Sequence, residues 1–79
     1  KNEMSIYPNP TNGAFIIELE VANNYTLHLI DQMGRIVQKS EFSGTQFTVD
    51  INGLQPGHYY VKVNATEENF PIKKLIVNL

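Results

Sequence analysis

Cysteine is absent from this chain of 79 residues, and its absence excludes several kinds of small protein. A disulfide-linked scaffold needs paired cysteines, and a zinc finger needs cysteine ligands. A chain without cysteine can fold in a reducing or in an oxidising compartment, so the composition does not indicate which one it occupies. A domain of this size without disulfides or an obvious metal site depends on its hydrophobic core, so we expect modest stability to which every strand contributes.

Long apolar runs and a basic stripe are also missing. Uninterrupted apolar segments are as short as Phe15–Ile17 and Leu75–Val77, whereas a membrane-spanning helix needs about 20 apolar residues. The formal net charge is −2 at pH 7 and the lysines are mostly scattered, which does not provide the continuous positive surface that a phosphate backbone requires. We therefore expect no membrane-spanning helix and no nucleic-acid partner.

Recognisable catalytic and metal-binding motifs are lacking as well. His28 and His58 fall on different predicted elements, and Ser43 lacks the G-x-S-x-G frame that presents a nucleophile. The acidic residues do not form a D-x-D-x-D-G loop, although calcium held by distant segments stays open. We therefore expect no enzymatic activity and no cofactor.

The sequence does contain a strong alternation of apolar and polar residues with a period of two. It runs through residues 14–21, 25–31, 46–51 and 58–63, and no window keeps a helical stripe over three turns. Such alternation is typical of strands with one buried face. The residues predicted to face the core are Phe15, Ile17, Leu19, Val21, Tyr25, Leu27, Leu29, Phe47, Val49, Ile51, Tyr59, Val61 and Val63.

The alternation changes phase within the last ten residues. Phe70 and Ile72 lie in one phase, and the apolar residues from Leu75 to Leu79 lie in the other. The adjacent lysines Lys73 and Lys74 mark the change, so a β-bulge is predicted there.

Turn signals separate the alternating segments at short intervals. They are Asn12-Gly13, Asn23-Asn24, Asp31 to Gly34, Ser43-Gly44, Asn52-Gly53 and Pro56-Gly57. Many short strands at this spacing predict an all-β fold, a small Ig-like antiparallel β-sandwich of about seven strands, formed by one domain over residues 1–79.

The segment PNPTNG interrupts this pattern near the start of the chain. Pro8 and Pro10 fix φ near −65° and lack N–H groups, so the segment cannot pair as a central strand. The side chains of Asn9, Thr11 and Asn12 can accept hydrogen bonds from backbone N–H groups, and Asn12-Gly13 tolerates the positive φ angles of a tight turn. The segment is therefore predicted to be a rigid elbow between the first two strands.

Four segments occur in order along the chain: YPNPTNG at 7–13, LIDQMGRIV at 29–37, INGLQPGHYYVKV at 51–63 and KKLIV at 73–77. Together they resemble the type A C-terminal sorting domain of the bacterial type IX secretion system, and the resemblance runs from about Met4 to Val77. Family members commonly end in lysine soon after the last apolar residues, whereas this chain ends in Asn78-Leu79. The matching positions include Pro8, Asn9, Pro10, Asn12, Gly13, Asp31, Gly34, Arg35, Leu54, Gly57, Tyr59 and Lys74 to Val77.

The resemblance implies a signal domain with no chemistry of its own. Such domains form a seven-stranded Ig-like sandwich at the C-terminus of a cargo protein, which passes through the periplasm and across the outer membrane to be secreted or attached to the cell surface. The implied partners are the type IX translocon, its shuttle proteins and a sortase-like cysteine protease that cleaves upstream, at or before Lys1. Because the chain begins with Lys1 and has no signal-peptide pattern, we expect it to be cut from a longer polypeptide.

Several parts of the chain are candidates for contact with the translocon. The guanidinium of Arg35 can pair with Asp31 or stay available to a partner. Tyr60 is expected to point outward beside Lys62, and aromatic residues are enriched at interface centres. The C-terminal strand can add to a partner's sheet edge through unpaired backbone groups, or it can merely close the sandwich. The candidate recognition residues are Arg35, Tyr60, Lys73, Lys74, Leu75, Ile76 and Val77.

The remaining motif positions are expected to serve the fold. Asp31 can cap N–H groups two residues further on, and Gly34 can take the left-handed position of a hairpin turn. Leu54, Gly57 and Tyr59 are expected to lead into a core strand.

A different class of function stays open on the sequence alone. The alternative is an Ig-like carbohydrate- or protein-binding module of a surface protein, for which a row of exposed aromatic residues is typical. Only Tyr60, with Phe42 or Tyr25, is available for such a row, because the other aromatic residues fall on predicted core positions. A passive spacer, or a homodimer formed through an edge strand, is a third possibility.

Overall fold

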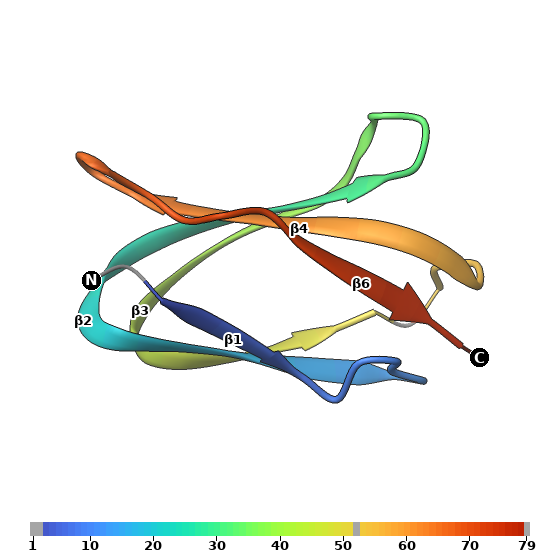
Figure 1. The fold of residues 1–79 in the computed structure, drawn as a ribbon, viewed down its shortest axis with the longest axis horizontal. Coiled ribbons are helices and arrows are strands. Elements are labelled where there is room, and N and C mark those ends of the chain that lie inside the picture. Colours follow the sequence, from blue (N-terminus) through green and yellow to red (C-terminus); the bar gives the residue numbers. More distant parts are fainter. Residues whose placement is uncertain (1–2, 52, 79) are drawn as a thin grey trace.

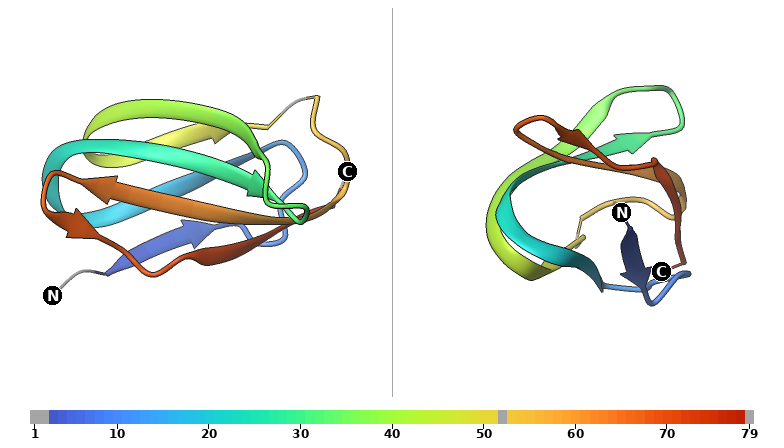
Figure 2. Two further views of the ribbon diagram at one scale, coloured as in Figure 1. Left: turned by 90° about the horizontal axis from the view of Figure 1, so that it is seen from above. Right: turned by 60° about the vertical axis from the view of Figure 1, so that its left-hand side comes forward.

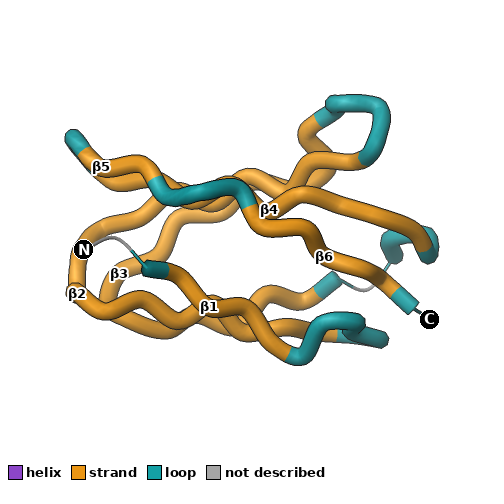
Figure 3. Tube along the Cα trace, in the orientation of Figure 1, coloured by secondary structure: helices purple, strands orange, loops and turns teal. Residues whose placement is uncertain are grey.

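The computed structural model describes residues 3–51 and 53–78, which form strands and no helix (Figure 3). The strands are β1 (Met4–Tyr7), β2 (Ala14–Asp31), β3 (Ile36–Asp50), β4 (Gly57–Ala65), β5 (Glu68–Asn69) and β6 (Lys73–Val77). All strand pairs are antiparallel, which confirms the predicted all-β class. Within these described ranges there is no helix long and apolar enough to cross a membrane.

The strands belong to one sheet that curls over on itself (Figure 1). The first half of β2 pairs with β1 and with the end of β3, and its second half pairs with the start of β3 and with β4. β4 also pairs with β5 and β6. The curl therefore gives two facing layers, as Figure 2 shows: the β1 layer, with β1, the start of β2 and the end of β3, and the β4 layer, with the rest.

Within residues 3–51 and 53–78 the structure has six strands where the sequence predicted about seven. Two predicted turns lie inside strands, which removes two strands, and the short β5 adds one. Asn23-Asn24 belongs to β2 and Ser43-Gly44 to β3. Pairing between these strands is interrupted after Glu18 and resumes at Asn23 opposite Gly44, and Gly44 has a φ of 111°, which residues with a side chain rarely adopt. The irregularity bends both strands without breaking them.

This bend also explains a wrong core prediction. Val21 was predicted to face the core, but its side chain is 59% exposed because the register shift interrupts the alternation of β2. Phe47 is partly buried and packs against the core. The remaining inward predictions for these strands are confirmed, with buried side chains at Phe15, Ile17, Leu19, Tyr25, Leu27, Leu29, Val49, Ile51, Tyr59, Val61 and Val63.

An aromatic cluster fills the core near the bend. The ring of Tyr25 lies 5.4 Å from that of Phe42 and 5.8 Å from that of Phe70, measured between centroids. The Tyr25 hydroxyl donates to the carbonyl of Val21, and burial, with a contribution from the negative charge of Glu68, raises the pKa of this phenol. Tyr25 and Phe42 are buried, so the suggestion that they join a row of exposed aromatic residues is wrong.

The C-terminal change of phase has a different cause from the predicted bulge. Phe70 is buried and Ile72 is 57% exposed, although they share a phase, because residues 70–72 lie outside any strand. Pro71 in this segment has no N–H for a strand ladder, and the new alternation starts with β6. Three positions named in the predictions, Lys1, Asn52 and Leu79, lie outside the described residues.

Candidate recognition surface

The four motif segments gather at one end of the molecule. The elbow joins β1 to β2, a turn joins β2 to β3, a loop joins β3 to β4, and β6 ends beside the elbow (Figure 1, Figure 2). We term this end, made of residues 8–13, 32–35, 53–56 and 77–78, the motif end. The bends of β2 and β3, the β4–β5 hairpin and the start of β1 lie at the opposite end (Figure 1).

The elbow holds the C-terminal strand through both side-chain and backbone hydrogen bonds. Asn9 donates from Nδ2 to the carbonyl of Lys74 at 2.8 Å and accepts the N–H of Ile76 at Oδ1, at 2.9 Å. The N–H of Thr11 donates to the carbonyl of Ile76 at 2.9 Å, and the N–H of Asn78 donates to the carbonyl of Thr11 at 2.7 Å. The elbow thus takes the place of a neighbouring strand along β6.

The backbone of the elbow differs from the tight turn that the sequence predicted. Thr11 is buried, and its hydroxyl donates to the carbonyl of Ala14, while the carbonyl of Gly13 accepts the N–H of Ile51 at 3.1 Å. Among the described residues, those with positive φ do not include Asn12 or Gly13, so the predicted use of positive φ angles here is wrong. The elbow depends on contacts with other segments more than on its own turn.

The surroundings of β6 change how its residues can act. Leu75 and Val77 are buried, so their side chains belong to the core in the folded domain. Ile76 is half-buried, and Lys73 and Lys74 are exposed. A partner that paired with the outer edge of β6 near Ile76 would have to displace the elbow, because that edge already has hydrogen-bond partners.

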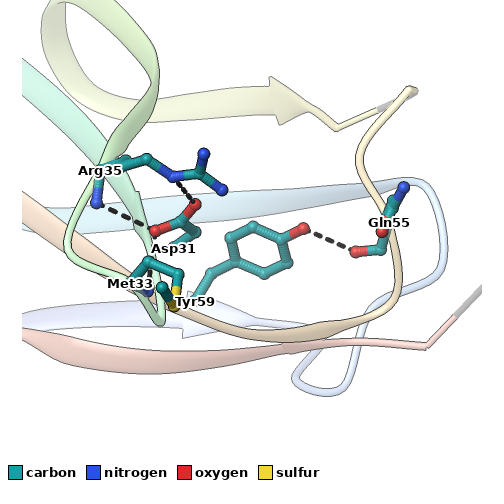
Figure 4. Close-up of polar contacts among 5 residues, drawn as sticks. All are labelled: Asp31, Met33, Arg35, Gln55 and Tyr59. Atoms are coloured by element: carbon teal, nitrogen blue, oxygen red, sulfur yellow. Dashed lines mark hydrogen bonds and ion pairs between the residues drawn. The ribbon is translucent and has the colours of Figure 1, made fainter.

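The turn between β2 and β3 is organised by Asp31, as predicted (Figure 4). Its Oδ1 accepts the N–H groups of Met33 and Arg35, each at 2.9 Å, and its carbonyl accepts the N–H of Gly34 at 3.0 Å. The Arg35 N–H bond is the main reason that the pKa of Asp31 lies below its usual value. Gly34 has a φ of 87°, which confirms its predicted left-handed position.

The guanidinium of Arg35 pairs locally and stays accessible at the same time. Its Nε lies 3.0 Å from Oδ2 of Asp31, while 76% of the Arg35 side chain is exposed. The first of the two alternatives, local pairing with Asp31, is therefore confirmed. Most of the Arg35 side chain is still exposed at the motif end, and its contact with a partner stays a prediction.

The loop before β4 lies beside this turn. Residues of the turn, including Met33 and Arg35, and residues 53–57 of the loop line one hollow between them. The Tyr59 hydroxyl donates to the carbonyl of Gln55 at 2.6 Å, which holds the loop over the start of β4 (Figure 4). Leu54 packs against the core, so Leu54 and Tyr59 serve the fold as predicted.

Tyr60 lies on the outer side of the β4 layer and is 37% exposed. It is paired with Ile30 of β2 and with Lys74 of β6, and it lines an apolar hollow together with Ile30 and Ile72. Ile30 and Ile72 were missed as candidates, because three separate segments of the chain bring them to Tyr60 and no local pattern in the sequence reports this. Within residues 3–51 and 53–78, no three or more histidine, aspartate or glutamate side chains are grouped to hold a metal ion.

Comparison with known proteins identifies the family. The sequence matches the secretion system C-terminal sorting domain over residues 5–78. An endo-acting ulvan lyase of Formosa agariphila is 31% identical over 77 residues, which cover 96% of this chain and 15% of that protein. Ulvan lyase NLR42 of Nonlabens ulvanivorans is 26% identical over 76 residues, which cover 95% of this chain and 14% of that protein. The chain therefore belongs to the C-terminal sorting domain family of type IX secretion, whose members are non-catalytic signal domains.

Proposed function

We propose that this domain is the address by which the type IX translocon of the outer membrane exports a cargo protein joined to its N-terminal side. The observation that carries the proposal is the family match over residues 5–78, together with the gathering of the four motif segments at the motif end. β1 starts at the opposite end, so a cargo attached ahead of it would leave the motif end accessible. The cargo is proposed to be a secreted or surface-attached protein, as the ulvan lyases that share this domain suggest.

The proposed recognition residues divide into two roles. Arg35, Lys73 and Lys74 are exposed and offer positive charge, and Tyr60 offers an exposed aromatic ring nearby in the β4 layer. Leu75 and Val77 act through the core, because they hold β6 in place, and Ile76 links β6 to the elbow through its backbone. The translocon and its shuttle proteins would then read a folded surface.

The upstream protease is proposed to act at the other end. A sortase-like cysteine protease would cleave at or before Lys1, upstream of β1, and β1 starts at the end opposite the motif end. Recognition and cleavage could then proceed without competing for the same surface, and the cargo would be released or attached to the cell surface afterwards.

Carbohydrate binding receives little support from the arrangement of the aromatic residues. Tyr60 is 37% exposed, and Tyr7 is 39% exposed, so the prediction that it belongs to the core was wrong. The two rings lie in different layers of the sheet. The rings of Phe15, Tyr25, Phe42, Tyr59 and Phe70 are buried, and Phe47 packs against the core. A flat row of stacking rings, which sugar-binding surfaces use, is therefore not formed by these side chains.

The proposal is tested by following a fluorescent reporter that carries a Sec signal peptide and residues 1–79 in a bacterium with a type IX system. Two further fusions carry matched substitutions of exposed apolar residues, Met33→Asp at the motif end and Val21→Asp at the opposite end. We expect the parent and Val21→Asp fusions to reach the surface or the medium, and the Met33→Asp fusion to accumulate in the periplasm. Circular dichroism of each purified domain checks that it is folded.

Two results would count against the proposal. If the parent fusion stays in the periplasm like the reporter without the domain, the export function is refuted. If both folded variants are exported as well as the parent, the domain is an export signal but the motif end is not what the translocon reads.

A further inference from the structure

Positive charge is concentrated on the outer side of the β4 layer. In register, His28 of β2 lies between Lys39 of β3 and Lys62 of β4, and Lys74 of β6 lies beside Tyr60 of β4. The residues on either side of His28 and Lys62 are buried, so these two side chains point away from the core. All three lysines are exposed.

An apolar centre adjoins these charges. Ile30 is paired with Ile36 on one side and with Tyr60 on the other, and Ile36 is 59% exposed. Ile72, which is 57% exposed, lines a hollow with Ile30 and Tyr60 that reaches Gly34 at the motif end. Exposed apolar side chains that gather in one patch mark interaction sites. We term this surface the basic face, made of Ile30, Ile36, Lys39, Tyr60, Lys62 and Lys74.

The β1 layer presents the opposite charge. Glu18, Glu20 and Asp50 are exposed there, and the described residues 4–7, 14–20 and 46–50, which build this layer, include no lysine or arginine. In the β4 layer, Glu41 pairs with Thr26, Glu68 of β5 pairs with Ala65, and Glu67 lies in the turn between β4 and β5, all away from the apolar centre. The carboxylate of Asp31 is engaged by Arg35. An acidic partner would therefore be attracted to one layer and repelled by the other.

We propose that the basic face docks onto an acidic protein surface of the export machinery, an inference that rests on the function proposed above. An aromatic and aliphatic centre with charges at its rim matches the anatomy of protein interfaces, where an aromatic anchor supplies most of the affinity. Anionic lipid fits less well, because polybasic lipid-binding segments carry about 4–8 clustered lysines or arginines, and the basic face has three lysines.

The lysines at the rim of the basic face and Tyr60 at its centre are expected to contribute differently to binding. Neutralising the lysines removes attraction at long range, which lowers the rate of association by about tenfold to a hundredfold at low salt. Truncating Tyr60 removes the anchor, which weakens affinity by about thirtyfold or more. Since Tyr60 is only partly buried and the lysines are exposed, neither change removes a core side chain.

The test compares two triple variants in the same export reporter. One carries Lys39→Gln, Lys62→Gln and Lys74→Gln, and the other carries Glu3→Gln, Glu18→Gln and Glu20→Gln, which are exposed and lie on or next to the β1 layer. Each variant neutralises the same number of charges. A third variant replaces the three lysines with arginine and keeps their charge. We expect export to fall at least tenfold for the lysine-to-glutamine variant and to stay near the parent level for the other two, with all domains folded by circular dichroism.

Each other outcome overturns the inference in a distinct way. If the parent is exported and the lysine-to-glutamine variant is exported equally well, the basic face is not a docking surface although the sorting function stands. Export that falls equally in both glutamine variants shows that charge in general is required. Binding of the parent domain to phosphatidylglycerol vesicles that is lost in the lysine-to-glutamine variant assigns the face to lipid. A dimer in sedimentation that either glutamine variant dissociates assigns it to a second copy of this chain.

Discussion

The clearest quantitative expectation concerns Asn9, whose side chain joins the elbow to β6. Asn9→Ala removes two hydrogen bonds, to the carbonyl of Lys74 and from the N–H of Ile76. Each intramolecular hydrogen bond contributes about 0.5–1.5 kcal/mol to stability, and both lie near solvent, where water replaces part of the loss, so we expect about 1–2 kcal/mol of destabilisation. For a domain of this size that lowers Tm by about 5–15 °C.

Asn12→Ala in the same elbow is the matched control. Asn12 is exposed, and its replacement is expected to change the free energy of unfolding by less than about 0.5 kcal/mol. Thermal and urea unfolding followed by circular dichroism measure both variants, and hydrogen exchange at the Ile76 amide reports the loss of its acceptor directly. Equal stability of the two variants, with unchanged exchange at Ile76, would refute the role given to the elbow.

Three further expectations concern other parts of the fold. The pKa of Asp31 is lowered in the folded state, so its carboxylate stabilises the domain above about pH 4 and loses this effect as pH falls through the folded pKa. In urea titrations, the stability difference between the parent and Asp31→Asn should therefore be larger at pH 7 than at about pH 3. Tyr59→Phe removes the hydrogen bond to Gln55 and should lower the free energy of unfolding by about 1 kcal/mol, whereas Tyr60→Phe should lower it by less than about 0.5 kcal/mol. Equal losses in urea titrations would contradict the role of the Tyr59 hydroxyl in holding the loop. Phe15→Ala should cost about 3–5 kcal/mol, which is most of the stability of so small a domain. It should abolish export although the C-terminal segment is unchanged. Export of a demonstrably unfolded variant would show that the translocon reads the C-terminal segment as a linear sequence.

Local chemistry predicted much of the fold correctly. Alternation identified the buried face of most strands, because one residue in two must leave the solvent when a sheet covers a core. The turn at Asp31 was predictable because all its hydrogen bonds are made within five residues. The outward position of Tyr60 followed from the same alternation.

The misses share a different origin. Asn23-Asn24 and Ser43-Gly44 have the composition of turns, and only the register between β2 and β3 decides that the chain bends there instead of reversing. The bond between Asn9 and Lys74 spans 65 residues of sequence, so no local pattern reports it. The grouping of Ile30, Tyr60 and Ile72 likewise exists only after three separate segments have come together.

The measurement that tests the central claim most directly is the location of the reporter fused ahead of residues 1–79 in two otherwise identical hosts, one with an intact type IX translocon and one in which the translocon pore is deleted. We expect fluorescence at the surface or in the medium of the first host and in the periplasm of the second. The same distribution in both hosts would contradict the claim that this domain directs type IX export.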